Sequence, residues 1–218
     1  MNVILIGSGG CMRELAWQML EQNKLENTDW TIEGFVDKEK PSEKVYANNV
    51  EIPYLGNDDY LLQKQEPTNV VITVGSPKLR NKIVNKLSGN INICFPNIIL
   101  SNVSLCGDIK IGRGCVISKN TSISTNVTIG DFVFINMESL ICHDCKIGNF
   151  VTLCPSVKLA GAVEIGDKSD IGLGSHIIQG IKIGSNVVLG AGSVAVRNIE
   201  SNSVAVGIPS KKIKDNLC

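Results

Sequence analysis

The sequence predicts an α/β domain with a small parallel sheet, followed by an all-β domain that winds as a parallel β-helix. Two observations carry this prediction. The N-terminal part alternates apolar strands with helical segments, and from Ile99 to Leu189 an aliphatic residue stands at every sixth position. We place the two domains at residues 1–92 and 93–218, with Pro96 in the connection between them.

The composition is that of an ordinary folded chain without a dominant charge. Of its 218 residues 43% are hydrophobic, and Lys plus Arg and Asp plus Glu number 21 each. A net charge of zero gives no general attraction to nucleic acid or anionic lipid. No apolar run approaches the roughly 18 residues of a membrane span, and the apolar N-terminus fits a buried strand better than a secretory signal. We therefore expect a cytoplasmic protein with no nucleic-acid partner and no membrane span.

Eight cysteines are spread along the chain, and we expect them to be free thiols. A chain without an export signal belongs in a reducing compartment, where disulfides are rare. Most of these side chains should serve as small apolar filler. They are Cys11, Cys94, Cys106, Cys115, Cys142, Cys145, Cys154 and Cys218.

The N-terminal segment has the pattern of a strand, a glycine turn and a helix. An apolar strand at Asn2–Ile6 leads into Gly7–Gly10 and then into a helix at Met12–Gln22. Such a turn aims backbone N–H groups and a helix N-terminus at phosphate oxygens. A dinucleotide fingerprint needs a third glycine where this chain has Met12, so an NAD-dependent oxidoreductase is disfavoured. A tight turn without any ligand fits the same residues and stays open.

Two further strands continue the alternation. The strand predicted at Thr31–Val36 is followed directly by Asp37. A carboxylate at this place commonly accepts hydrogen bonds from a ribose or a base. The next strand, Asn69–Val74, ends at Gly75, and a helix follows at Lys78–Leu87. The order of elements therefore predicts a small Rossmann-like parallel sheet with a nucleotide-type site.

The C-terminal part repeats with a period of six residues. Neither the helical period nor strand alternation produces this rhythm. A parallel β-helix does, because each six-residue group makes one flat face and one corner, and three groups make one coil of 18 residues. An ordinary β-sandwich would need loops of varying length, which break the register. The aliphatic residues of the period are Ile99, Leu105, Ile111, Ile117, Ile123, Ile129, Ile135, Ile141, Ile147, Leu153, Leu159, Ile165, Ile171, Ile177, Ile183 and Leu189.

Two other positions of the six-residue group follow the same rhythm. Four residues after most of the aliphatic residues stands a small or β-branched residue, and we expect both to point inward, so that each coil buries its ladder on the next. A glycine often follows the aliphatic residue, where a tight corner needs a backbone free of a Cβ atom. These glycines are Gly112, Gly130, Gly148, Gly166, Gly172, Gly184 and Gly190.

The chain has only two histidines, His143 and His176. Zinc in β-helical carbonic anhydrases needs three imidazoles, and catalytic zinc generally needs three protein ligands, so we expect no metal centre. His143 stands beside a predicted corner with its side chain outward, and Asp144 follows it. Together they have the parts of a general base and of a carboxylate that raises its basicity. A solvated surface histidine fits the same position, and we interpret His176 as structural.

These motifs resemble those of bacterial sugar acyltransferases of the NeuD and PglD kind, along the whole chain. The resemblance implies a left-handed β-helix and a homotrimer whose active sites lie between neighbouring prisms. It rests on the glycine turn with Glu14, on Gly34-Phe35-Val36-Asp37, on Val74-Gly75, on the six-residue repeat, on His143-Asp144-Cys145-Lys146-Ile147-Gly148, and on the tail Val206-Gly207-Ile208-Pro209-Ser210-Lys211.

The resemblance also implies roles for individual residues. His143 becomes the catalytic base and Asp144 the acid that increases its basicity. Members of the family often have histidine where this chain has Cys11, and an imidazole contact to the cofactor where it has Thr152. The implied nucleotide-sugar contacts are Gly9, Gly10, Cys11, Asp37, Lys38 and Gly75, and the implied cofactor contacts are Thr152, Leu173 and Ala191, the last two through their backbones.

The activity that follows is that of an acetyl-CoA-dependent N-acetyltransferase. Its acceptor would be the amino group of a nucleotide-linked amino sugar, such as a UDP- or GDP-4-amino-4,6-dideoxysugar, in surface glycan biosynthesis. O-acetylation of a sugar hydroxyl, as in the sialic acid type, would use the same base. A non-catalytic nucleotide-sugar-binding module is the alternative of another class. An acyltransferase for serine or another small amino acid would have no need of the nucleotide-type domain.

Overall fold

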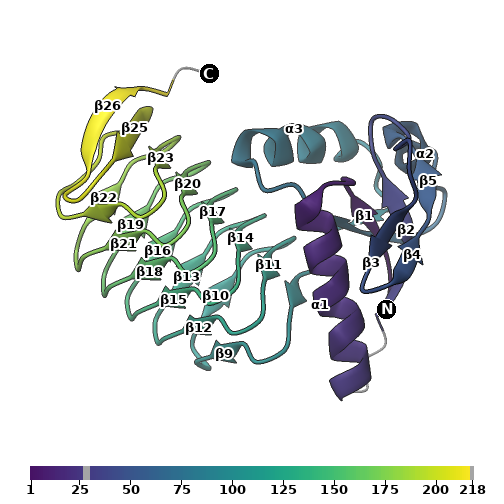
Figure 1. Cartoon of the computed structure of the whole chain (residues 1–218), viewed down its shortest axis with the longest axis horizontal. Helices are drawn as coiled ribbons and strands as arrows, with labels where there is room; N and C mark the ends of the chain where they lie inside the picture. The colour runs from purple at the N-terminus through teal and green to yellow at the C-terminus, as the bar shows by residue number, and fades with distance from the viewer. Residues whose placement is uncertain (27–29, 217–218) are drawn as a thin grey trace.

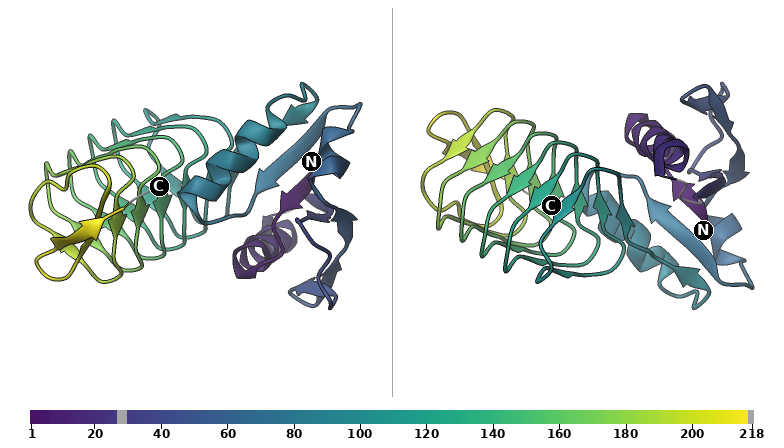
Figure 2. Two further views of the ribbon diagram at one scale, coloured as in Figure 1. Left: turned by 90° about the horizontal axis from the view of Figure 1, so that it is seen from above. Right: turned by 90° about the horizontal axis from the view of Figure 1, so that it is seen from below.

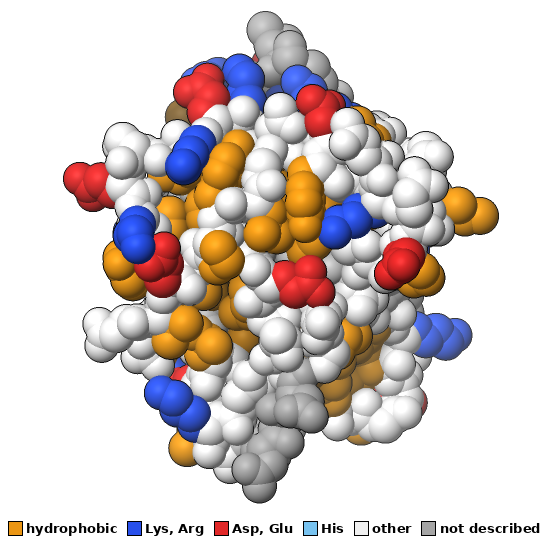
Figure 3. All heavy atoms as spheres, turned by 90° about the vertical axis from the view of Figure 1, so that its right-hand side faces the viewer, with side chains coloured by type: hydrophobic (Ala, Val, Ile, Leu, Met, Phe, Trp, Pro, Cys, Tyr) orange, Lys and Arg blue, Asp and Glu red, His pale blue; other side chains and the backbone are white. Residues whose placement is uncertain are grey.

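The computed structural model describes residues 1–26 and 30–216. An α/β domain stands at one end of an elongated β-helix, whose coils run away from it toward the C-terminus (Figures 1 and 2). On the end face of the α/β domain, basic, acidic and apolar side chains are interspersed (Figure 3). Both predicted fold classes are confirmed, and the coil is consistent with the left-handed form that the resemblance implied.

The N-terminal domain is a parallel five-stranded sheet with a helix on each face. Alternate residues of the first strand point to opposite sides of the sheet. Val3 and Leu5 pack in the cluster that holds Met12 of the first helix, whereas Ile4 packs with Val84 of the third. In sheet order the strands are β5 (Tyr54–Gly56), β2 (Thr31–Val36), β1 (Asn2–Ile6), β6 (Thr68–Ile72) and β7 (Ile93–Cys94), and the helices are α1 (Gly10–Glu26) and α3 (Pro77–Leu87).

The structure adds elements that the sequence pattern did not predict. A hairpin joins β3 (Val45–Ala47) to β4 (Val50–Ile52), with both turn residues at positive φ, and a short helix α2 (Asp58–Leu62) follows β5. These elements are too short to display a period, so the sequence signal for them is weak. The strand β7 pairs with β6 and extends the N-terminal sheet to Cys94, two residues beyond the expected boundary at 92.

Three parallel sheets form the faces of the β-helix, and most strands pair with the strand 18 residues later, as in Lys110 with Thr128. The last coil is two residues shorter, since Val188 pairs with Val204. The eight-stranded face contains β8 (Ile98–Ile99), β11 (Val116–Ile117), β14 (Phe134–Ile135), β17 (Thr152–Leu153), β20 (Asp170–Ile171), β23 (Val188–Leu189), β25 (Ser203–Val206) and the antiparallel β26 (Lys211–Asp215). The five-stranded face contains β10 (Lys110–Ile111), β13 (Thr128–Ile129), β16 (Lys146–Ile147), β19 (Glu164–Ile165) and β22 (Lys182–Ile183). The six-stranded face contains β9 (Ser104–Leu105), β12 (Ser122–Ile123), β15 (Leu140–Ile141), β18 (Lys158–Leu159), β21 (His176–Ile177) and β24 (Val194–Ala195).

The faces meet along three edges, each named here by one residue on it. The His143 edge joins the six-stranded and five-stranded faces, the Phe132 edge joins the five-stranded and eight-stranded faces, and the Leu173 edge joins the eight-stranded and six-stranded faces. A residue with left-handed φ recurs at these corners, for example Asn126 at 55°, Phe132 at 55° and Asp144 at 62°. The His143 edge is therefore the edge opposite the eight-stranded face.

The interior of the prism is the predicted aliphatic ladder. Ile117, Ile135, Leu153 and Ile171 are completely buried in one continuous cluster, and the residues four positions after them are buried as well: Thr121, Ser139, Val157 and Ser175. Burial of each such side chain contributes roughly 1.5–3 kcal/mol relative to leaving it exposed. The first coil is more open, since Leu105 is 37% exposed.

The repeated glycines of the Phe132 edge have a different cause from the one predicted. Their φ angles are not in the left-handed region; that conformation falls two residues later, as at Phe132. A Cβ atom on Gly112, Gly130 or Gly148 would instead collide with a side chain of the next coil. Close approach of successive coils, and not the turn conformation, therefore requires glycine here.

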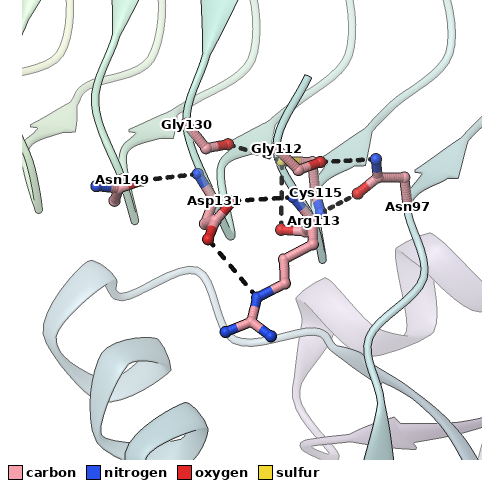
Figure 4. A network of polar contacts seen from close by, with 7 residues as sticks. All are labelled: Asn97, Gly112, Arg113, Cys115, Gly130, Asp131 and Asn149. Atoms are coloured by element: carbon pink, nitrogen blue, oxygen red, sulfur yellow. Dashed lines mark hydrogen bonds and ion pairs between the residues drawn. The ribbon is translucent and has the colours of Figure 1, made fainter. Parts of the chain in front are cut away.

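Side chains of this edge close the gaps between coils (Figure 4). Asn97 donates to Gly112 O at 2.7 Å and accepts from Cys115 N–H at 2.8 Å, and Asp131 Oδ1 accepts from Arg113 N–H at 3.0 Å. One coil later Asn149 Oδ1 accepts from Asp131 N–H at 2.8 Å. The amide and carboxylate groups thus pair backbone donors that the short strands leave open.

The two domains share their apolar cores. The cluster beneath α1 continues into Val116 and Phe134 on the outer side of the eight-stranded face, and the cluster beneath α3 continues into Phe132. The Phe132 ring stacks on Phe150, with centroids 5.2 Å apart. The N-terminal domain is consequently packed on the eight-stranded face and the Phe132 edge.

The cysteines agree with the expectation of free thiols within the described residues. The seven that lie in residues 1–26 and 30–216 form no disulfide, and Cys115 and Cys145 are buried in the prism. Cys218 lies outside the described residues.

Candidate active site

His143 follows β15 at the corner of the His143 edge, where the coil turns its side chain outward as predicted. Its side chain is 50% exposed. Nδ1 lies 2.7 Å from Asp144 Oδ2, and Asn126 Nδ2 donates to the other carboxylate oxygen, Oδ1, at 2.7 Å. Asp144 reaches both partners because its left-handed φ of 62° turns the carboxylate back over the corner.

The electrostatics of this pair define its tautomer. Hydrogen bonds from His143 first, and then from Asn126, lower the pKa of the Asp144 carboxyl, so that it is ionised at neutral pH. An ionised carboxylate only accepts hydrogen bonds, which places the proton of the neutral ring on Nδ1. The lone pair of Nε2 is then directed away from Asp144 and is available to accept a proton.

Gly161 of the next coil forms the floor beneath the imidazole. A Cβ atom built on Gly161 would lie 2.6 Å from His143 Nε2, closer than any real contact permits. The backbone of the two coils is joined there by Ala162 N–H, which donates to His143 O at 2.8 Å. The orientation of the His143 ring therefore depends on the absence of a side chain at Gly161, one coil away. The sequence pattern does not reveal this dependence.

A second group of predicted residues gathers at the carboxyl ends of three adjacent strands of the N-terminal sheet. Gly9 and Gly10 are exposed between β1 and α1, Asp37 follows β2, and Gly75 lies beyond β6. A Cβ atom on Gly9, Gly10 or Gly75 would meet nothing within 4 Å. The fold thus does not need these glycines for packing, and they leave bare backbone that a ligand can approach.

Asp37 and Cys11 differ in their ability to bind a ligand. The carboxylate of Asp37 accepts from the Ser8 hydroxyl at 2.5 Å and from the N–H of Lys38 at 2.7 Å, and the Lys38 side chain is exposed. Burial, and then the charge of Glu14, raise the pKa of the Cys11 thiol to about 11. Cys11 is therefore a neutral thiol, without the charge that a thiolate or an imidazolium would bring.

The residues predicted to contact the cofactor lie in two places. Leu173 and Ala191 are exposed on the Leu173 edge, and their N–H groups have no hydrogen-bond partner among the described residues. Thr152 instead is buried on the eight-stranded face, where its hydroxyl donates to Gly75 O at 2.6 Å. The structure therefore gives the Thr152 side chain a partner in the N-terminal domain.

One chain does not bring all the predicted site residues together. The glycine turn, Asp37, Gly75 and Thr152 are on the side of the eight-stranded face, whereas His143 and Asp144 lie on the opposite edge. The body of the prism stands between the two groups. The other histidine, His176, is exposed on the six-stranded face, as its outward position predicted.

Sequence reasoning missed Asp170, which follows Thr152 in the ladder of the eight-stranded face. Its half-buried carboxylate lies 3.7 Å from Cys154 Sγ, and it has no other hydrogen-bond partner among the described residues. Burial raises the pKa of Asp170, although Cys154 and the charge of Arg80 oppose this. The signal in the sequence is an acidic residue at an outward strand position that holds Val116, Phe134, Thr152 and Val188 in other coils.

A groove on the five-stranded face does not coincide with either group of site residues. It has a volume of about 720 Å³ on the five-stranded face, where Glu164 lies 3.1 Å from Lys182 and 3.7 Å from Lys146. Ion pairs between exposed side chains such as these contribute little. The His143 edge and the glycine turn are better candidates for the functional site, because polar side chains there lie beside backbone without side chains.

Residues 1–26 and 30–216 contain neither a metal-ligand cluster nor a membrane-spanning helix. In this part of the chain no three or more His, Cys, Asp and Glu side chains are grouped as metal ligands would be. The described helices include none with the length and apolarity of a bilayer span.

Comparisons with known proteins agree with the motifs. Residues 2–87 match the model of the PglD N-terminal domain. No curated protein sequence matches the chain. A solved variant of the GDP-perosamine N-acetyl transferase from Caulobacter crescentus, in complex with CoA and GDP-perosamine, is 26% identical over 99% of this chain and 98% of that chain, with a TM-score of 0.84.

Two further solved structures have the same architecture. The acetyltransferase domain of PglB from Neisseria gonorrhoeae is 25% identical over 97% of this chain and 99% of that chain, with a TM-score of 0.82. WeeI from Acinetobacter baumannii is 24% identical over 98% of this chain and 100% of that chain, with a TM-score of 0.82, a likeness that shows the fold alone.

We expect Asp170→Asn to raise the melting temperature at pH 7, because the half-buried carboxylate is destabilised by its own charge. The folded-state pKa lies above the unfolded value of about 3.9, so the penalty is absent at lower pH and grows as pH rises through the folded pKa. Thermal unfolding of both proteins between about pH 4 and pH 7 measures the difference.

Asp108→Asn is the contrasting control. The Thr125 hydroxyl lowers the pKa of Asp108, so its removal should not raise the melting temperature at pH 7. Equal effects of both substitutions, or a lower melting temperature for Asp170→Asn at pH 7, would contradict the conclusion that burial of the Asp170 charge costs more than Cys154 and Arg80 return.

Proposed function

We propose that this chain, a member of the NeuD/PglD-like sugar acyltransferase family, transfers an acetyl group from acetyl-CoA to the amino group of a nucleotide-linked amino sugar. The observation that carries the proposal is the His143–Asp144 pair, held over Gly161 with Nε2 free to accept a proton. The likeness to a GDP-perosamine transferase solved with both of its ligands supports the choice of donor and acceptor.

In the proposed mechanism Nε2 of His143 takes a proton from the acceptor amine as the amine nitrogen attacks the thioester carbonyl. The Asp144 carboxylate stabilises the imidazolium that forms. The C–N bond is made, the C–S bond breaks, and the proton held by His143 passes to the departing sulfur, so that amide and thiol are the products. The thioester is already activated, and no covalent enzyme intermediate is needed.

The glycine turn is suited to the nucleotide part of the acceptor. The exposed backbone of Gly9 and Gly10 opens helix α1, whose N-terminus favours phosphate oxygens. Asp37 lies beside the turn, where its remaining lone pairs can accept from a ribose or a base, and Lys38 adds a positive charge. Gly75 completes this surface.

The cosubstrate fits the Leu173 edge. Coenzyme A carries amide groups along an extended arm, and the unpaired N–H groups of Leu173 and Ala191 are donors at one-coil spacing. Acetyl-CoA supplies the activated acyl group. Acetyl-CoA and nucleotide sugars are both cytoplasmic metabolites, and we place the reaction there.

We further propose that the working unit is a homotrimer. The base on the His143 edge and the nucleotide residues on the eight-stranded face are separated by the prism, so neither group is complete in one chain. Packing the His143 edge of one copy against the Leu173 edge of another brings the base, the cosubstrate residues and the glycine turn of the second copy into one cleft. Cyclic symmetry then repeats the site at every interface.

The first test is an assay of thiol release with acetyl-CoA and UDP-, GDP- or dTDP-linked 4-amino sugars. We expect His143→Ala to lower kcat by a factor of about 10² to 10⁴, because the general base is lost. His176→Ala, at the other exposed histidine, is the matched control and should keep wild-type turnover.

Two results would overturn the proposal. Wild-type turnover in His143→Ala would exclude the base, and nucleotide-sugar binding without any turnover by the wild type would favour a non-catalytic module. The product distinguishes N- from O-acetylation, because an ester is hydrolysed in mild alkali and an amide persists.

A second prediction concerns the floor of the site. Gly161 is not in the left-handed region, so Gly161→Ala causes no backbone strain, but its Cβ must displace the His143 ring. We expect kcat/KM to fall about 10- to 100-fold, as for a misplaced catalytic group. Gly107→Ala is the control, because Gly107 occupies the same edge position three coils earlier with nothing within 4 Å. Equal activity of the two variants would show that the ring is not held on Gly161.

A further inference from the structure

Arg80 makes an unusual set of contacts between the two domains. Its side chain, on α3, is 1% exposed. Nε donates to Phe132 O at 2.8 Å, and one terminal nitrogen donates to Phe150 O at 2.9 Å and to Val151 O at 3.1 Å. These three carbonyls belong to two successive coils of the Phe132 edge. One side of the guanidinium is therefore anchored in the β-helix.

The other side of the guanidinium binds the backbone that follows β6. The second terminal nitrogen donates to Val74 O at 2.8 Å and to Gly75 O at 3.1 Å. The nitrogen that faces the coils also donates to Thr152 Oγ1 at 2.9 Å, and this hydroxyl in turn donates to Gly75 O at 2.6 Å. The carbonyl of Gly75 thus accepts from both domains.

Docking of the domains does not by itself require this network. Two apolar clusters already cross the junction through Val116, Phe134 and Phe132. Burial lowers the pKa of Arg80 to about 10, so the group stays charged at neutral pH and bears a desolvation cost. The planar guanidinium fixes both the direction and the distance of the carbonyl groups that it binds, whereas an apolar contact fixes neither closely.

The hydrogen bonds of Arg80 and Thr152 fix the position of the Gly75 backbone. No neighbouring atom prevents a side chain at Gly75, and its φ is not left-handed. Its backbone is nonetheless tied by two donors, one of which comes from the β-helix. Bare backbone that is fixed relative to the β-helix suits a surface where a ligand must be presented at a set distance from the coils.

We propose that Arg80 and Thr152 are positioning residues, which hold Gly75 in place for the nucleotide-linked sugar. The inference rests on the proposed function and deepens it. It moves Thr152 from the cofactor side, where the family resemblance had placed it, to the acceptor side. The two assignments differ in which substrate a change at Thr152 affects.

The test is Thr152→Val, which keeps the shape of the side chain and removes the hydroxyl. We expect KM for the nucleotide sugar to rise about 3- to 10-fold, as for one lost hydrogen bond, with kcat and KM for acetyl-CoA within about 2-fold of wild type. Thr152→Ser restores the hydroxyl and should recover most of the affinity. Thr128→Val is the matched control, since Thr128 has the equivalent strand position on the five-stranded face.

Two results would overturn the inference. A rise in KM for acetyl-CoA alone would return Thr152 to the cofactor, and unchanged KM values for both substrates would leave it without a positioning role. Arg80→Lys provides a second measurement, because an ammonium cannot reproduce the fork. If this variant folds, its KM for the nucleotide sugar should rise at least as much as that of Thr152→Val.

A binding measurement separates this inference from the proposed function. GDP, UDP and dTDP are titrated into the wild type and Thr152→Val by calorimetry, without acetyl-CoA. Weaker nucleotide binding by the variant supports the positioning role even if no amino sugar is acetylated. Equal affinity in the two proteins would contradict the positioning role even if the wild type is an active acetyltransferase.

Discussion

The hydrogen bonds that join successive coils in register are the constraint on which the rest of the structure depends. Because strands pair at a spacing of 18 residues, the face or edge of every outward side chain is fixed by its position in the repeat. His143 accordingly stacks between Thr125 and Gly161, and Thr152 lies beside Asp170. A site built in this way needs no mobile loop to orient its base, since the coil below and the coil above determine the ring position.

The same rigidity keeps the two groups of predicted site residues apart within one chain. The apolar clusters stabilise the N-terminal domain on the eight-stranded face, and Arg80 fixes its rotation there through carbonyls of both domains. This arrangement directs the glycine turn away from His143 of the same chain. The glycine turn and His143 are separated because the two domains pack through apolar surface. A movement of the N-terminal domain toward His143 would have to expose that surface to water.

Much of this organisation was predictable because it is periodic. The six-residue period predicts the β-helix, and it places His143 on an outer corner, where the structure has it. The strand, glycine turn and helix predicted the α/β domain with its small parallel sheet. The short hairpin around Asn48 and the helix α2 were missed, since elements of three to five residues show no period.

Contacts between distant segments were not predictable. Nothing in the local sequence of Arg80 shows that it will reach Phe132, and Thr152 could be placed on a face but not paired with Gly75. The repeated glycines were predicted for the wrong reason, because a Cβ atom there is excluded by side chains and backbone of the neighbouring coil and not by the turn conformation. These features depend on how the two domains are docked, which no repeat encodes.

The central claim is that each active site combines the base of one chain with the nucleotide residues of another, and mixed oligomers test it most directly. His143→Ala removes the base, and Gly9→Trp fills the space that the glycine leaves for a ligand, so each variant alone should be inactive. Co-expression of the two should restore about a quarter of wild-type activity, because random assembly into rings pairs an intact base with an intact glycine turn at that frequency. Mixtures as inactive as the single variants would show that the site is formed within one chain.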